Sequence, residues 1–209
     1  TRMSLSIGLL GVVLSLLLGI FLGSISGYYG GIIDNLIQRA IEVIRSFPQI
    51  PLWLTLAAAL PNSWSTTEVY FAISIILSLT TWTGLARVIR GKFISLREED
   101  FILASKLAGT SDTKIMFVYM LPSFYSYLIA HLTLSIPNMI VAETSLSFLG
   151  LGLQAPAVSW GVLLQSVQNF TSIVHMPWML STCIVVVISI LAFNFAGDAL
   201  RDAADPYEG

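Results

Sequence analysis

The residues that could do chemistry in this 209-residue chain are concentrated in one charged segment, residues 87–122, between two apolar runs. This segment holds six of the ten basic residues: Arg87, Arg90, Lys92, Arg97, Lys106 and Lys114. Lysine and arginine are the most numerous charged residues of this segment. Their chemistry is the binding of a surface, which is either a layer of lipid headgroups or a protein partner.

The sequence lacks the residue patterns that other kinds of chemistry require. There is no phosphate-binding loop, because the nearest match, residues 84–93, has the wrong glycine spacing and no hydroxyl residue after Lys92. There is no HExxH, no GxSxG and no Cys/His cluster with metal spacing. We therefore expect no catalytic, cofactor-binding or metal-binding residue in this chain, and no enzyme activity of its own.

Titratable side chains also occur within or at the end of apolar runs, at His131, Glu143 and Cys183. An ionisable group inside a span is by default a functional hypothesis, but for His131 we favour a neutral imidazole bonded to a neighbouring helix. Glu143 is the one carboxylate of the apolar runs that a proton-driven carrier could use, and it lies at the outer end of its run. Cys183 also lies in an apolar run, and we expect it to be buried by packing.

Composition sets the class of the protein. The chain is 56% hydrophobic and only 11% charged, with a mean hydropathy of +0.83, whereas soluble domains carry roughly 25% charged residues. This predicts an all-α, polytopic membrane protein. A helix needs about 20 apolar residues to cross a bilayer, and five segments reach that length: residues 3–27, 32–60, 69–86, 119–142 and 177–196.

The second of these segments is irregular. Arg39, Glu42 and Arg45 recur every three residues and form one polar stripe on a helix. Pro48 and Pro51 then interrupt the helical pattern. We interpret the segment as an interfacial helix that leads into a short, kinked span, and a functional hinge is the alternative.

The basic residues predict the orientation. Residues 61–68 and 144–176 contain no Lys or Arg, so these loops are expected outside and residues 87–122 in the cytoplasm. Trp64 and Trp178 lie near the expected outer boundary. Five spans with a cytoplasmic C-terminus place Thr1 outside, so we expect a further helix to precede Thr1 in the native chain.

Small residues recur at every fourth position of the first span, at Gly11, Ser15, Gly19, Gly23 and Gly27. On a helix these residues line one face and allow another backbone to approach closely. We expect tight packing within the chain, with a contact to another subunit as the alternative.

Within the charged segment, residues 97–108 are compatible with a short helix that has Phe101, Ala104, Leu107 and Ala108 on one side. Gly109 suits the C-terminal end of that helix because glycine tolerates a positive φ. Thr110, Ser111 or Asp112 can cap a second helix, and Pro122 follows where this helix enters the bilayer. Because its apolar side is small, the first helix suits a protein groove better than lipid.

At this point the residues resemble a known family. The string ASKLAGTSDTKIMFVYMLPS resembles the EAA loop of ABC importer permeases, with Ala104, Gly109, Leu121 and Pro122 in register. Leu103, Ser105 and Tyr119 stand where the family pattern has Glu, Ala and Ile. Three further strings resemble the peptide branch of the family: SISGYYGGIIDNLIQRAIEVIRSFPQIPL, TSLSFLGLGLQAPAVSWGVLLQ and NFAGDALRDAADP.

The resemblance implies the C-type permease subunit of an oligopeptide or dipeptide importer, with the type I ABC importer fold, in the plasma (inner) membrane of a prokaryote. It implies a homologous second permease, two cytoplasmic ATPases that bind ATP and Mg, an extracytoplasmic solute-binding protein, surrounding lipid and no nucleic acid. Residues 100–112 would form the coupling helix. The coupling residues implied are Asp100, Phe101, Ala104, Ser105, Lys106, Gly109, Asp112, Leu121 and Pro122.

The same resemblance divides the chain into a permease domain, residues 1–198, and a cytoplasmic tail, residues 199–209. The domain would include a coupling-helix loop at about 92–121 and an extracytoplasmic loop at about 143–177. Within the outer loop, Gly150, Gly152, Pro156 and Gly161 rule out one continuous helix, and the loop is expected either to cover the outer leaflet or to form a gate. In the tail region, the expected helix caps are Asp198, Arg201, Asp202 and Asp205.

Relatives of this type carry dipeptides, longer peptides, nickel or oligosaccharides, and the sequence names no substrate residue. The alternatives to a peptide importer are therefore the same importer type for nickel or oligosaccharide, an ATP-independent secondary carrier, or a non-transporting membrane scaffold. A secondary carrier would need buried carboxylates or an inverted repeat, and neither is visible.

Overall fold

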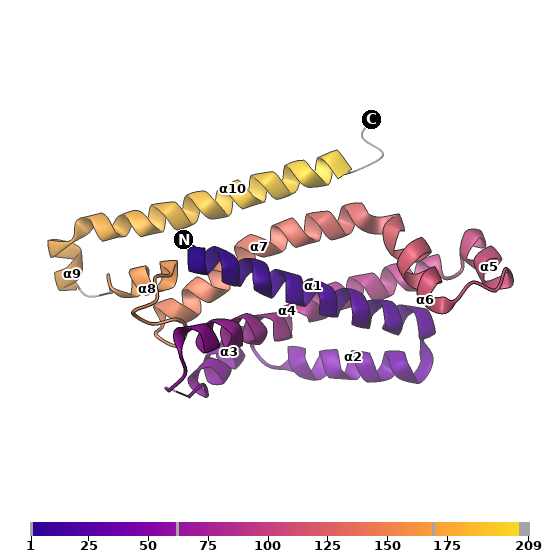
Figure 1. Ribbon diagram of the computed structural model, residues 1–209, viewed down its shortest axis with the longest axis horizontal. Coiled ribbons are helices and arrows are strands. Elements are labelled where there is room, and N and C mark those ends of the chain that lie inside the picture. The colour runs from indigo at the N-terminus through magenta and orange to yellow at the C-terminus, as the bar shows by residue number, and fades with distance from the viewer. Residues whose placement is uncertain (1, 62, 169, 205–209) are drawn as a thin grey trace.

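The computed structural model describes residues 2–61, 63–168 and 170–204, and within these ranges the regular structure is entirely helical (Figure 1). The long helices are α1 (Arg2–Tyr29), α4 (Thr66–Leu96), α7 (Tyr125–Phe148) and α10 (Ser181–Ala204). The shorter ones are α2 (Gly31–Ser46), α3 (Gln49–Ala58), α5 (Asp100–Leu107), α6 (Asp112–Lys114), α8 (Trp160–Gln165) and α9 (Phe170–His175). A π-helical stretch (Ile115–Met120) and a 3₁₀ turn (Leu121–Phe124) join α6 to α7, and another 3₁₀ turn (Pro177–Leu180) leads into α10.

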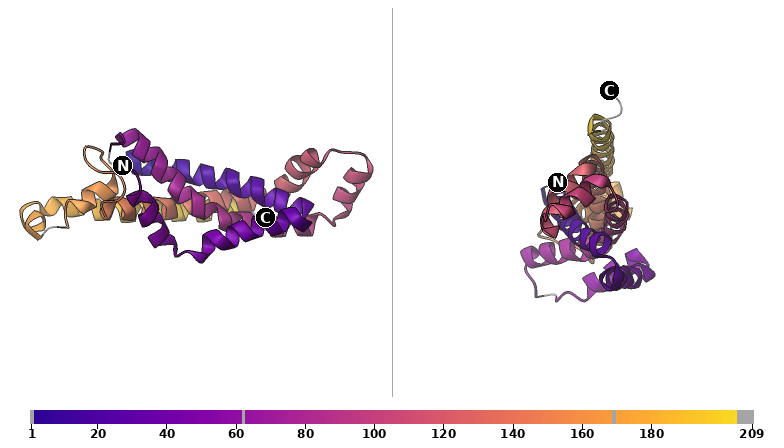
Figure 2. Two further views of the ribbon diagram at one scale, coloured as in Figure 1. Left: turned by 90° about the horizontal axis from the view of Figure 1, so that it is seen from below. Right: turned by 90° about the vertical axis from the view of Figure 1, so that its right-hand side faces the viewer.

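The long helices run side by side and define two ends of the molecule (Figure 1). One end carries α5, α6, the turn between α1 and α2, and the end of α10, whereas α8, α9 and the start of α1 lie at the other end. Helix α10 contacts α7 along one side only. The α5–α6 hairpin extends beyond the bundle, which is clearest in the left view of Figure 2.

The small-residue face of α1 packs within the chain, as predicted. A Cβ added to Gly27 would lie 2.6 Å from the Cβ of Phe93, and one added to Gly23 would lie 2.7 Å from the carbonyl oxygen of Ala86. Gly11, nearer the start of α1, faces Met139 of α7 instead. The strip therefore seats α1 in the groove between α4 and α7, where small residues allow the backbones to approach closely.

The predicted second span is broken in the structure. Helix α2 ends at Ser46, and α3 begins at Gln49 after an extended Phe47. Arg39 and Glu42 of the polar stripe form an exposed ion pair at 2.9 Å. At ten residues, α3 is too short to cross a bilayer alone, so the segment is an amphipathic helix followed by a short apolar one.

Four helical stretches within the described residues are long and apolar enough to cross a membrane: Arg2–Tyr29, Thr66–Leu96, Asp112–Phe148 and Pro177–Ala203. The five predicted spans therefore reduce to four full-length helices plus the short α3. All four stretches also extend beyond their predicted bounds. Helix α4 continues to Leu96, so Arg87, Arg90 and Lys92 extend it instead of starting a loop.

The end opposite the hairpin is held together by a buried polar network. The fully buried Glu143 accepts a hydrogen bond from the Ser147 hydroxyl at 2.8 Å, and that hydroxyl accepts one from the Leu153 amide at 3.0 Å. The Trp160 amide donates to the Ser4 hydroxyl of α1 at 2.9 Å. Since α7 stops at Phe148 and α8 starts at Trp160, the predicted outer loop is not one continuous helix, and it is pinned to α1 and α7.

One burial prediction was wrong. Cys183 is exposed, because α10 packs on α7 along a single side and leaves most of its own surface uncovered. In the expected tail, Asp198, Arg201 and Asp202 are residues of α10, which continues to Ala204. The predicted cap Asp205 lies outside the described residues.

Candidate coupling site

The charged segment folds into a hairpin of two short helices. Helix α4 ends at Leu96, a turn follows, and α5 runs from Asp100 to Leu107. Six of the predicted coupling residues lie on α5 or directly after it: Asp100, Phe101, Ala104, Ser105, Lys106 and Gly109. Asp112 begins α6, which returns toward the bundle.

Gly109 ends α5 as its sequence position predicts. Its φ is +75°, its amide donates to the Lys106 carbonyl at 3.0 Å, and the Thr110 amide donates to the Ser105 carbonyl at 3.1 Å. This pair of bonds is the Schellman arrangement, which requires a left-handed residue at the first position after the helix. Ser111 is the N-cap residue of α6, although its side chain makes no capping bond.

A single side chain of α5 anchors the hairpin to the bundle. Ile102 is fully buried, and its cluster includes Phe93 of α4 and Ile115 and Met120 of the π-helical stretch. Burial of one such side chain stabilises by about 2 kcal/mol. Ile102 is not among the residues predicted to form the apolar side of this helix, which were Phe101, Ala104, Leu107 and Ala108.

A second anchor joins the hairpin to α1. The Tyr28 hydroxyl donates to Oδ1 of Asp112 at 2.7 Å, and the Lys106 ammonium lies 5.1 Å from the centre of the Tyr28 ring. Tyr28 is itself buried in the cluster around Ile102. Helices α1, α5 and α6 therefore meet at one tyrosine.

We predict that Tyr28 and Asp112 act as a pair. Tyr28→Phe and Asp112→Ala each remove the same hydrogen bond, which is worth about 1.5–3 kcal/mol because its acceptor is a carboxylate. The double variant should lose no more thermal stability than either single variant, as a double-mutant cycle in detergent measures. Asp112→Asn is the matched control because it keeps the acceptor oxygen, and additive losses would show that the pair does not interact.

The rest of α5 faces away from the bundle. Leu107 is 91% exposed, and Phe101 and Leu103 are each 45% exposed. Ala104 and Lys106 are exposed as well, while Ser105 is half-buried and donates to the Phe101 carbonyl at 2.8 Å. An eight-residue helix with this much exposed apolar surface is suited to docking in a complementary groove of a partner protein.

Leu121 and Pro122 are not part of the hairpin's exposed surface. They lie in the 3₁₀ turn at its base, where Leu121 is buried in the cluster around Ile102. Pro122 has no amide hydrogen, and the change from π to 3₁₀ geometry occurs at this point of the helix. The structure therefore separates the nine predicted coupling residues into an exposed hairpin and a buried base.

A charged pair near the same end fixes α2. Arg90 of α4 donates from Nε to Oδ1 of Asp34 at 2.6 Å and from Nη2 to Oδ2 at 2.5 Å. The Ser26 hydroxyl also donates to Asp34, at 2.5 Å. The bond from Arg90 is the main cause that lowers the pKa of Asp34. Helices α1, α2 and α4 are joined at this carboxylate, which the sequence analysis did not single out.

Asp34 predicts a pH dependence of stability. Because its pKa is lower in the folded state, its contribution is complete above the unfolded pKa of about 3.9 and is lost as the pH falls through the folded value. At pH 7, Asp34→Asn should cost about 2 kcal/mol, since hydrogen bonds to charged groups are worth ~1.5–3 kcal/mol. The difference from wild type should stay constant between pH 5 and 7 and shrink below pH ~4.

Thermal unfolding in detergent across this pH range measures the effect. Glu42→Gln is the matched control, since it breaks the exposed Arg39–Glu42 pair of the same helix, and pairs of that kind contribute little. An equal loss for both variants would show that the Asp34–Arg90 pair does not fasten α2.

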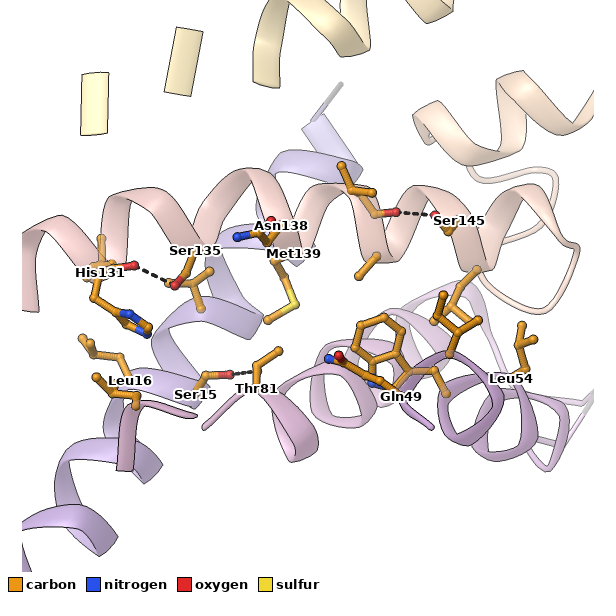
Figure 3. A pocket seen from close by; sticks show the side chains of 18 of the residues that line it. Ser15, Leu16, Gln49, Leu54, Thr81, His131, Ser135, Asn138, Met139 and Ser145 are labelled. Atoms are coloured by element: carbon orange, nitrogen blue, oxygen red, sulfur yellow. Dashed lines mark hydrogen bonds between the residues drawn. The ribbon is translucent and has the colours of Figure 1, made fainter. Parts of the chain in front are cut away.

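An elongated cavity of about 480 Å³ lies between α1, α3, α4 and α7 (Figure 3). His131 reaches into it from α7, toward Leu16 and Ser15. The expectation that His131 bonds to a neighbouring helix was wrong: among the described residues, the only interaction of its ring is the stacking on Tyr127, at 5.9 Å between centroids. The described residues contain no group of three or more His, Cys, Asp or Glu that could hold a metal ion.

The arrangement of helices is shared with solved transporter chains. The model overlays with a TM-score of 0.65 and 21% identity on a chain of the MetNI methionine ABC transporter in an inward-facing conformation, covering 98% of this chain and 92% of that one. A chain of an amino acid ABC transporter crystallised with histidines gives a TM-score of 0.63 at 16% identity, covering 97% and 89%. The fold is therefore that of the membrane subunits of ABC importers.

Sequence comparison defines the family. Residues 19–207 match the family described as binding-protein-dependent transport system inner membrane component. The chain is 33% identical over 206 residues to the oligopeptide transport system permease protein OppC of Bacillus subtilis (strain 168), and these residues are 98% of this chain and 65% of the relative. It is 38% identical over 206 residues to the dipeptide transport system permease protein DppC of Alkalihalophilus pseudofirmus, covering 98% and 65%.

This chain belongs to that family of inner membrane components and is a multi-pass membrane protein. It spans a little under two thirds of the length of the OppC and DppC relatives that it matches.

Proposed function

We propose that this chain is the permease subunit of an ATP-driven peptide importer, and that the α5–α6 hairpin couples it to a cytoplasmic ATPase. The single observation that carries the proposal is the hairpin's construction. It extends beyond the bundle, exposes Leu107 at 91%, and is anchored by the buried Ile102. A helix that is both uncovered and firmly attached can transmit the movement of a partner to the spans.

The distribution of basic residues supports the proposed orientation of the chain in the membrane. The hairpin end carries Arg87, Arg90 and Lys92 along the last turns of α4 and Lys106 and Lys114 on the hairpin. Basic residues next to spans indicate the cytoplasmic side. The end of α10 lies at the same side of the bundle, so we place the C-terminus and residues 199–209 in the cytoplasm and the loop of about 143–177 outside. On this topology the coupling-helix loop, about 92–121, which includes the hairpin, can meet an ATPase, and the protein lies in a prokaryotic plasma membrane.

The mechanism needs two packings of the spans. A nucleotide can shift their populations only if ATP-bound and ATP-free ATPases contact the hairpin differently. Rigid attachment through Tyr28 and Ile102 would then convert that difference into rocking of α1, α4 and α7. ATP and Mg would be bound by the two partner ATPases, while a homologous second permease would complete the path and a solute-binding protein would deliver the substrate.

Peptides are the proposed substrate because the matching relatives are named as oligopeptide and dipeptide transport permeases. The test is reconstitution of the complex in vesicles. Peptide-loaded binding protein should stimulate ATP hydrolysis and peptide uptake together, whereas the chain without ATPases should transport nothing under an ion gradient. Gradient-driven transport by the isolated chain would contradict the proposal.

A further inference from the structure

The cavity between α1, α3, α4 and α7 is not a local pocket, because it extends along much of the length of α7. Its lining on α7 begins at His131 and continues to Leu149. Eighteen helical steps at 1.5 Å span about 27 Å, close to the roughly 30 Å of hydrocarbon in a bilayer. The lining residues therefore follow one face of α7 over a length comparable to that hydrocarbon thickness (Figure 3).

That face of α7 carries polar side chains among apolar ones, and part of it is not covered by the chain. Asn138 and Ser145 are exposed, and Ser135 and His131 are half-buried. A second hollow, between α7 and α10, shares His131, Ser135 and Asn138 with the first. An amide near the middle of a span is costly in contact with lipid and indicates water or a partner group.

The hydrogen-bonding capacity of this wall is mainly that of an acceptor. Ser135 donates to the His131 carbonyl at 2.6 Å, and Ser145 donates to the Val141 carbonyl at 2.7 Å. Asn138 donates one amide hydrogen to the Leu134 carbonyl at 3.1 Å. A hydroxyl that donates to its own helix can only accept from a ligand, so the wall offers oxygen atoms to N–H groups.

The opposite wall is fixed and also uncharged. Trp53 of α3 donates to the Thr80 hydroxyl of α4 at 2.9 Å, and Gln49 donates to the same hydroxyl at 3.4 Å. No Asp, Glu, Lys or Arg is among the described residues that line the cavity. Such a lining discriminates little between ligand side chains of different charge, while it can recognise the N–H donors that every peptide backbone carries.

We propose that this cavity is the chain's wall of the peptide path, and that Ser135, Asn138 and Ser145 accept hydrogen bonds from the N–H groups of the passing peptide. This inference rests on the proposed function. It adds which face of α7 contacts the peptide and which residues do so. It also adds that these residues accept the hydrogen bonds and the peptide donates them.

Cysteine accessibility in the reconstituted complex tests the placement. In a Cys183→Ser background, Asn138→Cys is compared with Leu191→Cys, whose side chain is 48% exposed on α10 and lies in the middle of that helix. A charged, water-soluble thiol reagent should label position 138 at least about tenfold faster, since an apolar span position stays dry. Dialanine-loaded binding protein should slow the labelling of position 138 and leave position 191 unchanged.

Uptake of dialanine tests the chemistry. Asn138→Leu removes the acceptor at similar volume and should lower uptake by about tenfold, as expected for the loss of one hydrogen bond to the peptide. Asn138→Ser keeps an acceptor and should restore much of it. If loaded binding protein stimulates ATPase activity but position 138 labels no faster than 191, or is not protected, the inference is wrong and the proposed function stands. If no stimulation occurs in the Cys183→Ser parent, both are wrong.

Discussion

Replacing Gly109 with valine is expected to uncouple ATP hydrolysis from peptide uptake. The residue has φ +75°, and nothing lies within 4 Å of an added Cβ, so the substitution acts through backbone conformation and not through a clash. A left-handed conformation costs a non-glycine residue about 1–2 kcal/mol, and a β-branched residue more. The end of α5 should therefore unwind and release the hairpin from its fixed position.

Uptake and ATPase activity of the reconstituted complex are the measurement, and we expect uptake per ATP to fall by about tenfold or more, the equivalent of 1.4 kcal/mol. Gly91→Val is the matched control, because Gly91 lies on α4 near the hairpin, also has open space around it and has no positive φ. Gly109→Asn should be milder, since asparagine tolerates the left-handed region. Unchanged uptake in Gly109→Val would contradict the placement of the coupling helix.

Replacing Gly27 with alanine should destabilise the bundle as a whole. The new methyl group would lie 2.6 Å from the Cβ of Phe93 and 2.7 Å from the carbonyl oxygen of Arg90. A backbone oxygen cannot move aside as a flexible side chain can, so α1 must shift away from α4. We expect a loss of about 3 kcal/mol, at the upper end for overpacking.

Thermal unfolding in detergent measures this loss, with Gly84→Ala as the control. Gly84 lies on the same helix as Phe93 and has nothing within 4 Å of an added Cβ. Alanine there should be neutral or stabilising by about 0.5–1 kcal/mol, because it reduces the freedom of the unfolded chain. Equal effects at the two positions would show that α1 and α4 are not in close contact at Gly27.

The sequence predicted those structural features that depend on residues close together in the chain. The four-residue spacing of Gly19, Gly23 and Gly27 requires a close helix contact whatever the partner is, and Gly109 follows a short amphipathic run, where a positive φ ends the helix. The break near Pro48 was also readable, because proline lacks an amide hydrogen and disfavours the helical conformation of the residue before it. These predictions depend on backbone sterics, which neighbours in the sequence determine.

Features that depend on distant segments were not predictable from one sequence. Tyr28 and Asp112 are 84 residues apart, and no pattern in either segment indicates the other. The Asp34–Arg90 pair spans 56 residues. The exposure of Cys183 has the same origin, because hydropathy shows that α10 is apolar but not whether protein covers it. Ile102 was missed since helix periodicity alone does not show which apolar side meets the bundle.

The central claim is that the hairpin is held by a separate nucleotide-hydrolysing protein. A photoreactive amino acid at Leu107, the most exposed apolar residue of α5, tests it in native membrane vesicles, with the same probe at Ile184 of α10 as the control. We predict that the probe at position 107 forms one main protein adduct, identified by mass spectrometry as an ATPase, and that the probe at position 184 does not. Adducts with phospholipid alone at position 107 would contradict the account.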